Sequence, residues 1–232
     1  MKYRELRKKL IPDYAAIQYL LCALGLCVAY YLTSLLNGIF RDGYDTYFDI
    51  TSRFDRMIPV VPIWTVMYFF SYVFWIISYL WVSRESREMS NRLLFADLIG
   101  KVLCTAVFLI APTTAERPPV ADDAFAAPLL KLLFAIDEPV NLFPSMHCSV
   151  SWFAVRYVLK CKKIPTWYKF TAVLLMLAVF ASVLFTKQHV IIDIFGGIAV
   201  AELSIQVSDR TGLYKLYNKL DVARFYEKRN AK

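Results

Sequence analysis

Two histidines are the residues in this chain whose type and spacing best suit chemistry. His147 and His189 are the only histidines among the 232 residues, and His189 lies four residues before Asp193. On a helix, residues four apart share one face. A carboxylate that accepts a hydrogen bond from one imidazole nitrogen fixes the tautomer and leaves the other nitrogen free as a nucleophile or base. A polar clamp between helices is the alternative, and spacing alone favours neither.

His147 belongs to the segment Pro144-Ser145-Met146-His147. Proline is favoured in the first turn of a helix, where its missing N–H is no loss. The free backbone amides of that turn, together with the Ser145 hydroxyl, make a site for an anion. An anion site beside a titratable side chain suits phosphoryl chemistry. The alternative is an ordinary proline-initiated helix with a histidine at the membrane interface.

Arg117 is the third candidate and precedes Pro118 and Pro119 in a predicted loop. Its planar guanidinium matches the oxygen atoms of a phosphate. Taken alone, a solvated loop arginine is the more common interpretation.

Long apolar segments must position these residues. The chain is 58% hydrophobic, with a mean hydropathy of +0.45. About 20 apolar residues cross a bilayer as a helix, which satisfies its own backbone groups there. We predict an all-α bundle with six transmembrane helices, near residues 14–40, 57–83, 93–111, 144–159, 164–185 and 190–208. Residues 14–208 form one membrane domain between a basic N-terminal segment, 1–13, and a basic tail, 209–232.

Lysine and arginine are distributed unevenly between the predicted loops. With the N-terminus cytoplasmic, the inner segments hold most of the 27 basic residues. Basic residues favour the cytoplasmic side, so we predict that both termini lie there. The histidines then lie at the outer ends of the fourth and sixth helices. The net charge of +8 indicates contact with anionic lipid headgroups rather than nucleic acid.

Three motifs together resemble the type-2 phosphatidic acid phosphatase superfamily. Its pattern is K-x6-R-P, then P-S-x-H, then S-R-x5-H-x3-D. This chain supplies Arg117-Pro118, the segment 144–147, and Ser182 followed by His189 and Asp193. The resemblance covers roughly residues 55 to 205.

The resemblance implies a role for each candidate residue. His189 is expected to attack phosphorus with Asp193 holding its ring, and His147 to act as general acid and base. Phosphate binding is expected from Arg117, Ser145 and Lys187. No metal or other cofactor is expected.

Two cations of the family pattern are absent. Ile110 stands at the position of the family lysine and Val183 at that of the arginine, which leaves Lys187 as the candidate substitute. Two other charged residues within predicted helices are expected to be structural. We predict that Lys101 pairs with Asp97, and that Arg156 forms a structural pair for which Glu202 is one candidate partner.

The expected function is therefore a lipid phosphate phosphatase of the plasma membrane, with its site facing outside. Its substrate would be a phospholipid or an isoprenyl phosphate. The form Lys187-Gln188-His189 resembles the branch that includes inositol phosphorylceramide synthases, so a phosphotransferase is the alternative. A binding protein or transporter without activity is the third possibility.

A short apolar helix near residues 125–134 is expected to cover the site at the interface or to pack on the bundle. The oligomeric state is left open.

Overall fold

Long apolar helices make up most of the structure. The computed structural model describes residues 11–40, 47–121 and 124–220, so most of the predicted segment 1–13 and half of the tail 209–232 lie outside the described residues. The longer elements are α2 (Ala16–Cys27), the π-helical turn η1 (Val28–Leu32), α3 (Thr33–Phe40), α5 (Trp64–Glu85), α6 (Arg87–Ile110), α8 (Met146–Lys160), α9 (Thr166–Phe185) and α10 (Ile191–Thr211). The shorter ones are α4 (Arg53–Met57), α7 (Ala127–Ile136), the 3-10 helix η3 (Leu213–Lys219) and the paired strands β1 (Phe48–Asp49) and β2 (Thr113–Thr114).

Five helical segments in the described part of the chain are long and apolar enough to cross a membrane. They are Ala16–Phe40, Trp64–Glu85, Arg87–Ile110, Thr166–Phe185 and Ile191–Thr211. This finding supports an integral membrane protein. Five of the six predicted membrane helices thus correspond to helices of spanning length.

The fourth predicted membrane helix corresponds to α8, which has only 15 residues. At 1.5 Å per residue it is about 22 Å long, shorter than the hydrocarbon core of a bilayer. It lies at the centre of the bundle, in contact with α5, α6, α9 and α10. Its buried side chains include Phe153 and Tyr157. The prediction of six spans therefore stays a prediction.

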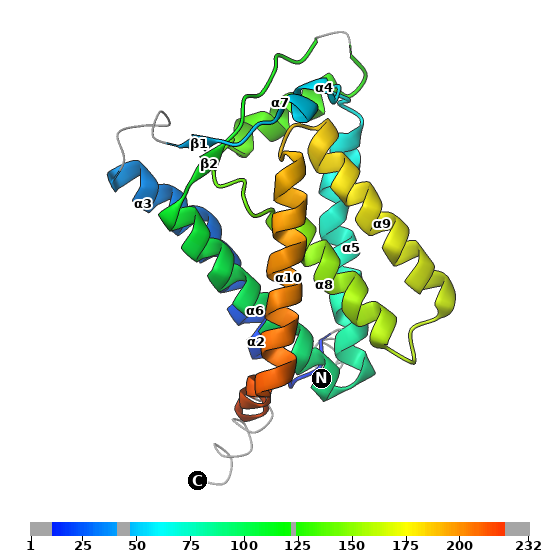
Figure 1. Cartoon of the computed structure of the whole chain (residues 1–232). Coiled ribbons are helices and arrows are strands. Elements are labelled where there is room, and N and C mark those ends of the chain that lie inside the picture. The colour runs from blue at the N-terminus through cyan, green and yellow to red at the C-terminus, as the bar shows by residue number, and fades with distance from the viewer. Residues whose placement is uncertain (1–10, 41–46, 122–123, 221–232) are drawn as a thin grey trace, which may run out of the picture.

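The helices run alternately between two ends of the molecule. The segment α2–α3, α6 and α9 run toward the end that carries α4, α7 and the two strands, which we call the site end (Figure 1). Helices α5, α8 and α10 run back to the opposite end, the far end. Gln18 of α2 donates to the carbonyls of Tyr217 and Leu220, so the described chain begins and ends at the far end. The cytoplasmic location of the far end stays a prediction.

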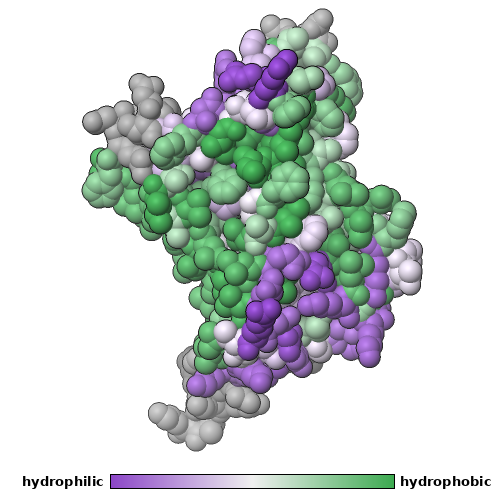
Figure 2. Space-filling model, viewed as in Figure 1, coloured by the Kyte–Doolittle hydropathy of each residue, from purple (hydrophilic) through white to green (hydrophobic). Residues whose placement is uncertain are grey.

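The surface separates polar from apolar side chains along the same axis. On the face in view, apolar side chains cross the middle of the bundle and polar side chains gather at both ends (Figure 2). At the far end the polar surface extends upward over α8 and α10.

Helix α10 packs closely on the start of α8 because two glycines leave room. A Cβ on Gly197 would lie 2.5 Å from the carbonyl oxygen of Ser145, and one on Gly196 would overlap the Phe143 ring. The Ser145 N–H also donates to the Asp193 carbonyl at 3.1 Å. The small residues that follow Asp193 thus allow a close contact between the two helices.

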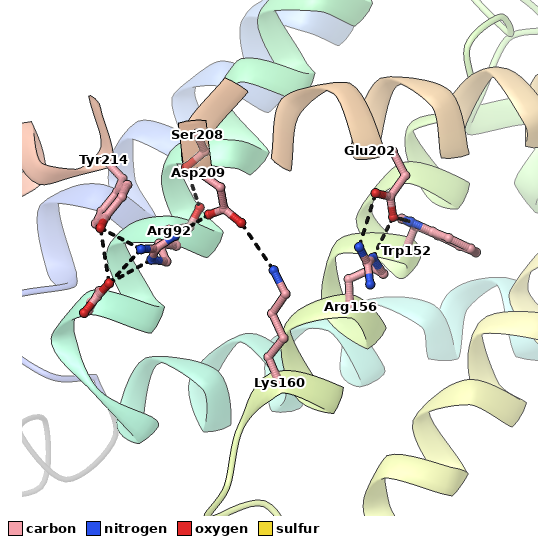
Figure 3. A network of polar contacts seen from close by, with 9 residues as sticks. Arg92, Trp152, Arg156, Lys160, Glu202, Ser208, Asp209 and Tyr214 are labelled. Atoms are coloured by element: carbon pink, nitrogen blue, oxygen red, sulfur yellow. Dashed lines mark hydrogen bonds and ion pairs between the residues drawn. The ribbon is translucent and has the colours of Figure 1, made fainter. Parts of the chain in front are cut away.

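Both charged pairs predicted within the bundle are present. Arg156 Nε lies 2.6 Å from Glu202 Oε1, joining α8 to α10 (Figure 3). Lys101 pairs with Asp97 one turn away on α6, and both side chains are almost fully buried. Lys101 and Arg156 therefore form ion pairs within the bundle.

Candidate active site

His189 and Asp193 form the predicted pair at the start of α10. His189 Nδ1 lies 3.1 Å from Asp193 Oδ2, which also accepts the Val190 N–H at 2.9 Å. Asp193 is fully buried, and its Oδ1 has no partner among the described residues. The contact at Nδ1 leaves His189 Nε2 as the nitrogen available for chemistry.

His147 lies in the first turn of α8, next to His189. The two imidazole centroids are 5.9 Å apart, so the second and third motifs lie side by side. The rings of Tyr68 and Trp75 on α5 pack against His147 at centroid distances of 4.4 and 5.3 Å. His147 Nε2 is buried and lacks a hydrogen-bond partner within the described structure.

Arg117 is held beneath α7 rather than solvated, which overturns the simpler interpretation of a loop arginine. One terminal nitrogen donates to the Asp137 carbonyl and the other to Gln188 Oε1, at 2.8 Å. Its guanidinium lies over the Phe134 ring of α7 at 4.6 Å. Burial lowers the Arg117 pKa to about 10, so the side chain stays charged at neutral pH.

Lys187 reaches away from Arg117, toward α4. Its backbone is left-handed (φ 53°), and Nζ donates to the carbonyls of Asp55 and Ile58 at 2.7 and 2.6 Å. Burial lowers the Lys187 pKa. An ammonium has three N–H donors, so one remains for a substrate oxygen.

Ser145 is the N-cap of α8 and is fully buried. Its Oγ accepts the Cys148 N–H at 3.3 Å. The hydroxyl proton stays free to donate, so capping the helix and binding an anion are compatible.

Asp55 is a site residue that the sequence analysis missed. Its Oδ1 accepts the Ile191 N–H at 2.7 Å, and Oδ2 accepts the Ser52 N–H at 2.8 Å. It therefore ties α4 to the start of α10, directly beside His189. Ser52-Arg53-Phe54-Asp55 is a capping-box pattern, which is the signal that could have revealed it.

Asp137, at the end of α7, was also missed and has no motif to mark it. Its carboxylate accepts hydrogen bonds from the Tyr30 hydroxyl of η1 and, at 2.8 Å, from the Tyr68 hydroxyl of α5. Burial raises the Asp137 pKa to about 6. The same Tyr68 ring packs on His147, so Asp137 joins the first helix to the histidine site.

A pocket of about 370 Å³ opens beside His189, between α4, the loop after β2 and the start of α10. Charged residues of both signs line it, including Arg56, Glu116 and Lys187. Arg56 and Glu116 form an ion pair of 3.3 Å at its exposed edge. His189 faces this pocket, whereas Arg117 lies beneath α7.

Comparison with known families gives one match. Residues 50–207 match the family model of the PAP2 superfamily, a range that contains every candidate residue described above. No curated protein and no solved structure gives a significant match.

Proposed function

Because this chain belongs to the PAP2 superfamily, we propose that it hydrolyses a phosphomonoester or diphosphate lipid through a phosphohistidine intermediate. Members of that superfamily are typically phosphatases or related phosphoryl-transfer enzymes. One observation carries the proposal: two imidazoles lie 5.9 Å apart, and a buried carboxylate orients one of them. A phosphoryl group between the rings could meet a nucleophile on one side and a proton donor on the other.

The reaction proceeds in two steps. His189 Nε2 attacks phosphorus, and the P–N bond forms as the bond to the lipid oxygen breaks. Asp193 stabilises the positive ring, and His147 protonates the departing oxygen. His147 then takes a proton from water, which attacks phosphorus, releases phosphate and restores His189.

Three groups stabilise the negative charge on the phosphoryl oxygens. Arg117 contributes a partly buried positive charge, Lys187 its remaining N–H, and Ser145 its hydroxyl with the free amides of α8. Such preorganised donors stabilise the transition state without having to reorganise during the reaction. The helix start adds a partial positive charge.

We place the site on the outer face of the plasma membrane, because the predicted inner loops carry most of the basic residues. Helix α7 supports entry of a lipid at this level. It buries Leu130 and Leu133 against the bundle and exposes Leu132 and Ile136.

A specific observation favours a phosphotransferase as the second candidate. Two of the three Lys187 donors are occupied by carbonyls, and the family's other cation positions hold Ile110 and Val183. A less positive site suits the single charge of a phosphodiester better than the one to two charges of a monoester. The pocket beside His189 also has room for a headgroup.

Purified protein in detergent micelles tests both candidates with a panel of phospholipids and isoprenyl diphosphates, with and without an alcohol acceptor. A phosphatase releases phosphate without the acceptor, and a phosphotransferase forms a new phosphodiester lipid only with it. We expect His189→Ala and His147→Ala to abolish either activity. Leu203→Ala, at an exposed position of α10, is the control. If both histidine variants keep full turnover, the histidine mechanism is wrong. If the wild-type protein turns over no lipid in either assay, a binding protein or transporter is the remaining interpretation.

A further inference from the structure

Gln188 is a buried side chain whose amide is satisfied at only one end. Its Oε1 accepts a hydrogen bond from Arg117 at 2.8 Å. Its Nε2 is buried and has no partner in the described part of the chain, and the residue is only 4% exposed. Burying a donor without a partner costs free energy, so native structures rarely leave one unsatisfied.

The orientation of this amide follows from chemistry. A guanidinium only donates hydrogen bonds, so the oxygen of Gln188 must face Arg117. With the amide reversed, N–H groups would point at N–H groups. The free end of Gln188 is therefore a donor.

The backbone next to His189 sends the side chains of Lys187 and Gln188 to different partners. The N–H groups of Gln188 and His189 both donate to the Val183 carbonyl, at 2.9 and 3.1 Å. Lys187 turns toward α4, while Gln188 turns toward Arg117 beneath α7.

Two further buried nitrogens near Gln188 also lack partners. They are Nε of Arg117, which holds the amide, and Nε2 of His147, whose ring neighbours that of His189. The three unsatisfied nitrogens belong to residues linked to His189: Gln188 precedes it, Arg117 bonds Gln188, and the His147 ring neighbours its ring. They suit a ligand with several acceptor atoms. A phosphoryl group offers such a set of oxygens.

We propose that Gln188 is a phosphate-binding residue, whose side-chain N–H donates to a phosphoryl oxygen while Arg117 holds the amide in place. The proposal rests on the proposed function and adds a contact to it. Gln188 provides a neutral donor in a site where Ile110 and Val183 replace two cations of the family pattern.

A structural role is the competing explanation, in which Gln188 only supports Arg117. Gln188→Glu still accepts from Arg117 and cannot donate, but its negative charge also repels an anion. Gln188→Met removes both functions at similar volume without adding charge. The two roles are separated in an Arg117→Met background, where a purely structural Gln188 has nothing left to support and tolerates Met, whereas a phosphate ligand does not.

The chain contains a matched control in Gln18 of α2. It is fully buried at the far end, and its polarity is reversed: Nε2 donates to two carbonyls and Oε1 lacks a partner among the described residues. Gln18→Met should lower the unfolding temperature and leave anion binding unchanged.

The experiment uses the full chain in micelles and measures binding of orthovanadate, a mimic of five-coordinate phosphorus, together with lipid turnover. We expect Gln188→Glu and Gln188→Met to weaken vanadate binding at least about tenfold, equivalent to about 1.4 kcal/mol. Gln188→Glu should keep the wild-type unfolding temperature because its ion pair with Arg117 remains. Vanadate affinity of Gln188→Glu within about twofold of wild type overturns the proposal.

The two proposals fail separately. Wild-type protein that binds vanadate through Gln188 but turns over no lipid contradicts the enzymatic function and supports the anion contact. Wild-type turnover that the Gln188 variants retain in full contradicts the contact and leaves the function standing.

Discussion

Polar groups are satisfied differently at the two ends of the bundle. At the far end, Glu202 accepts from Arg156 and Trp152, and Asp209 lies between Arg92 and Lys160 (Figure 3). At the site end, buried polar atoms without a partner in the described structure occur in Arg117, His147, Gln188 and Asp193. The ion pairs at the far end are therefore complete within the protein, although buried atoms of Gln18, Asn91 and Tyr217 there also lack a partner among the described residues. At the site end the unpartnered atoms belong to the candidate catalytic and phosphate-binding residues, where a ligand could complete them.

The difference separates stability from function. Unsatisfied and desolvated polar groups are typical of functional sites, whereas paired charges are typical of structure. Most far-end pairs are partly exposed: the Arg156 and Glu202 side chains are 40% and 30% accessible. Pairs of this kind contribute little individually. Lys101 and Asp97 are the buried exception, so they offer the largest test.

Asp97→Asn should give the largest loss of stability. It leaves the Lys101 ammonium almost fully buried without its counter-charge and weakens the hydrogen bond from Tyr79. Breaking a buried ion pair costs about 3–5 kcal/mol. The measurement is unfolding in mixed micelles with increasing denaturing detergent, together with turnover per folded molecule, which should not change.

Asp209→Asn is the control for that variant, because its pairs with Arg92 and Lys160 are partly exposed. It should lose less than about 1 kcal/mol. Equal losses for the two variants, or a selective loss of turnover in Asp97→Asn, would contradict the division between the two ends.

Gly197→Ala should affect both stability and activity, because this glycine lies between the two ends of the comparison. The added Cβ would meet the Ser145 carbonyl at 2.5 Å and push α10 from the start of α8. Overpacking costs about 1–3 kcal/mol. His147 and His189 sit on the two displaced elements, and a shift of about 1 Å can reduce a rate about 100-fold. Unfolding and turnover are measured on the same preparation.

Gly38→Ala on α3 is the matched control, because no atom lies within 4 Å of an added Cβ. It should stabilise the protein by about 0.5–1 kcal/mol through helix propensity and leave turnover unchanged. If Gly197→Ala behaves in the same way, the contact between α10 and α8 does not set the histidine geometry.

Helical periodicity predicted the contacts made within one helix or between adjoining turns. Asp97–Lys101 is such a pair within α6. His189–Asp193 is also present at the predicted spacing, but His189 precedes α10 and meets Asp193 across the helix start. The apolar runs also predicted most helices correctly. The π-helical turn Val28–Leu32 was not predicted, because its apolar residues read like the rest of the first helix.

The remaining contacts depend on how the connecting segments fold, which periodicity does not encode. Arg117 and Gln188 are 71 positions apart, and Asp55 and Ile191 are 136 apart. Lys187 illustrates the limit: sequence places it beside His189, but its left-handed backbone directs the side chain toward α4. The sequence therefore predicted that Lys187 lies near His189, but not that its side chain binds the carbonyls at α4.

The smallest expected effect is a change in pH dependence at Asp137→Asn. Burial raises the pKa of this carboxyl from 3.8 to about 6 in the folded protein. Its stabilising contribution is therefore complete below about pH 4 and lost as pH rises through 6. At pH 7.5 the neutral amide should make the protein more stable by about 1 kcal/mol, since a lost acceptor for Tyr30 or Tyr68 offsets part of the gain.

The test is the difference in unfolding free energy between Asp137→Asn and wild type from pH 4.5 to 7.5. Taking the difference removes the titrations that both proteins share. His189 and Glu138 are the charged groups that face this carboxyl. We expect this difference to grow as pH rises toward 6. We also expect slower turnover, because Tyr68 packs on His147 and loses its carboxylate partner. Both results would support a site end in which groups needed for function reduce stability. If the difference in unfolding free energy does not change with pH, Asp137 would behave like the paired charges of the far end.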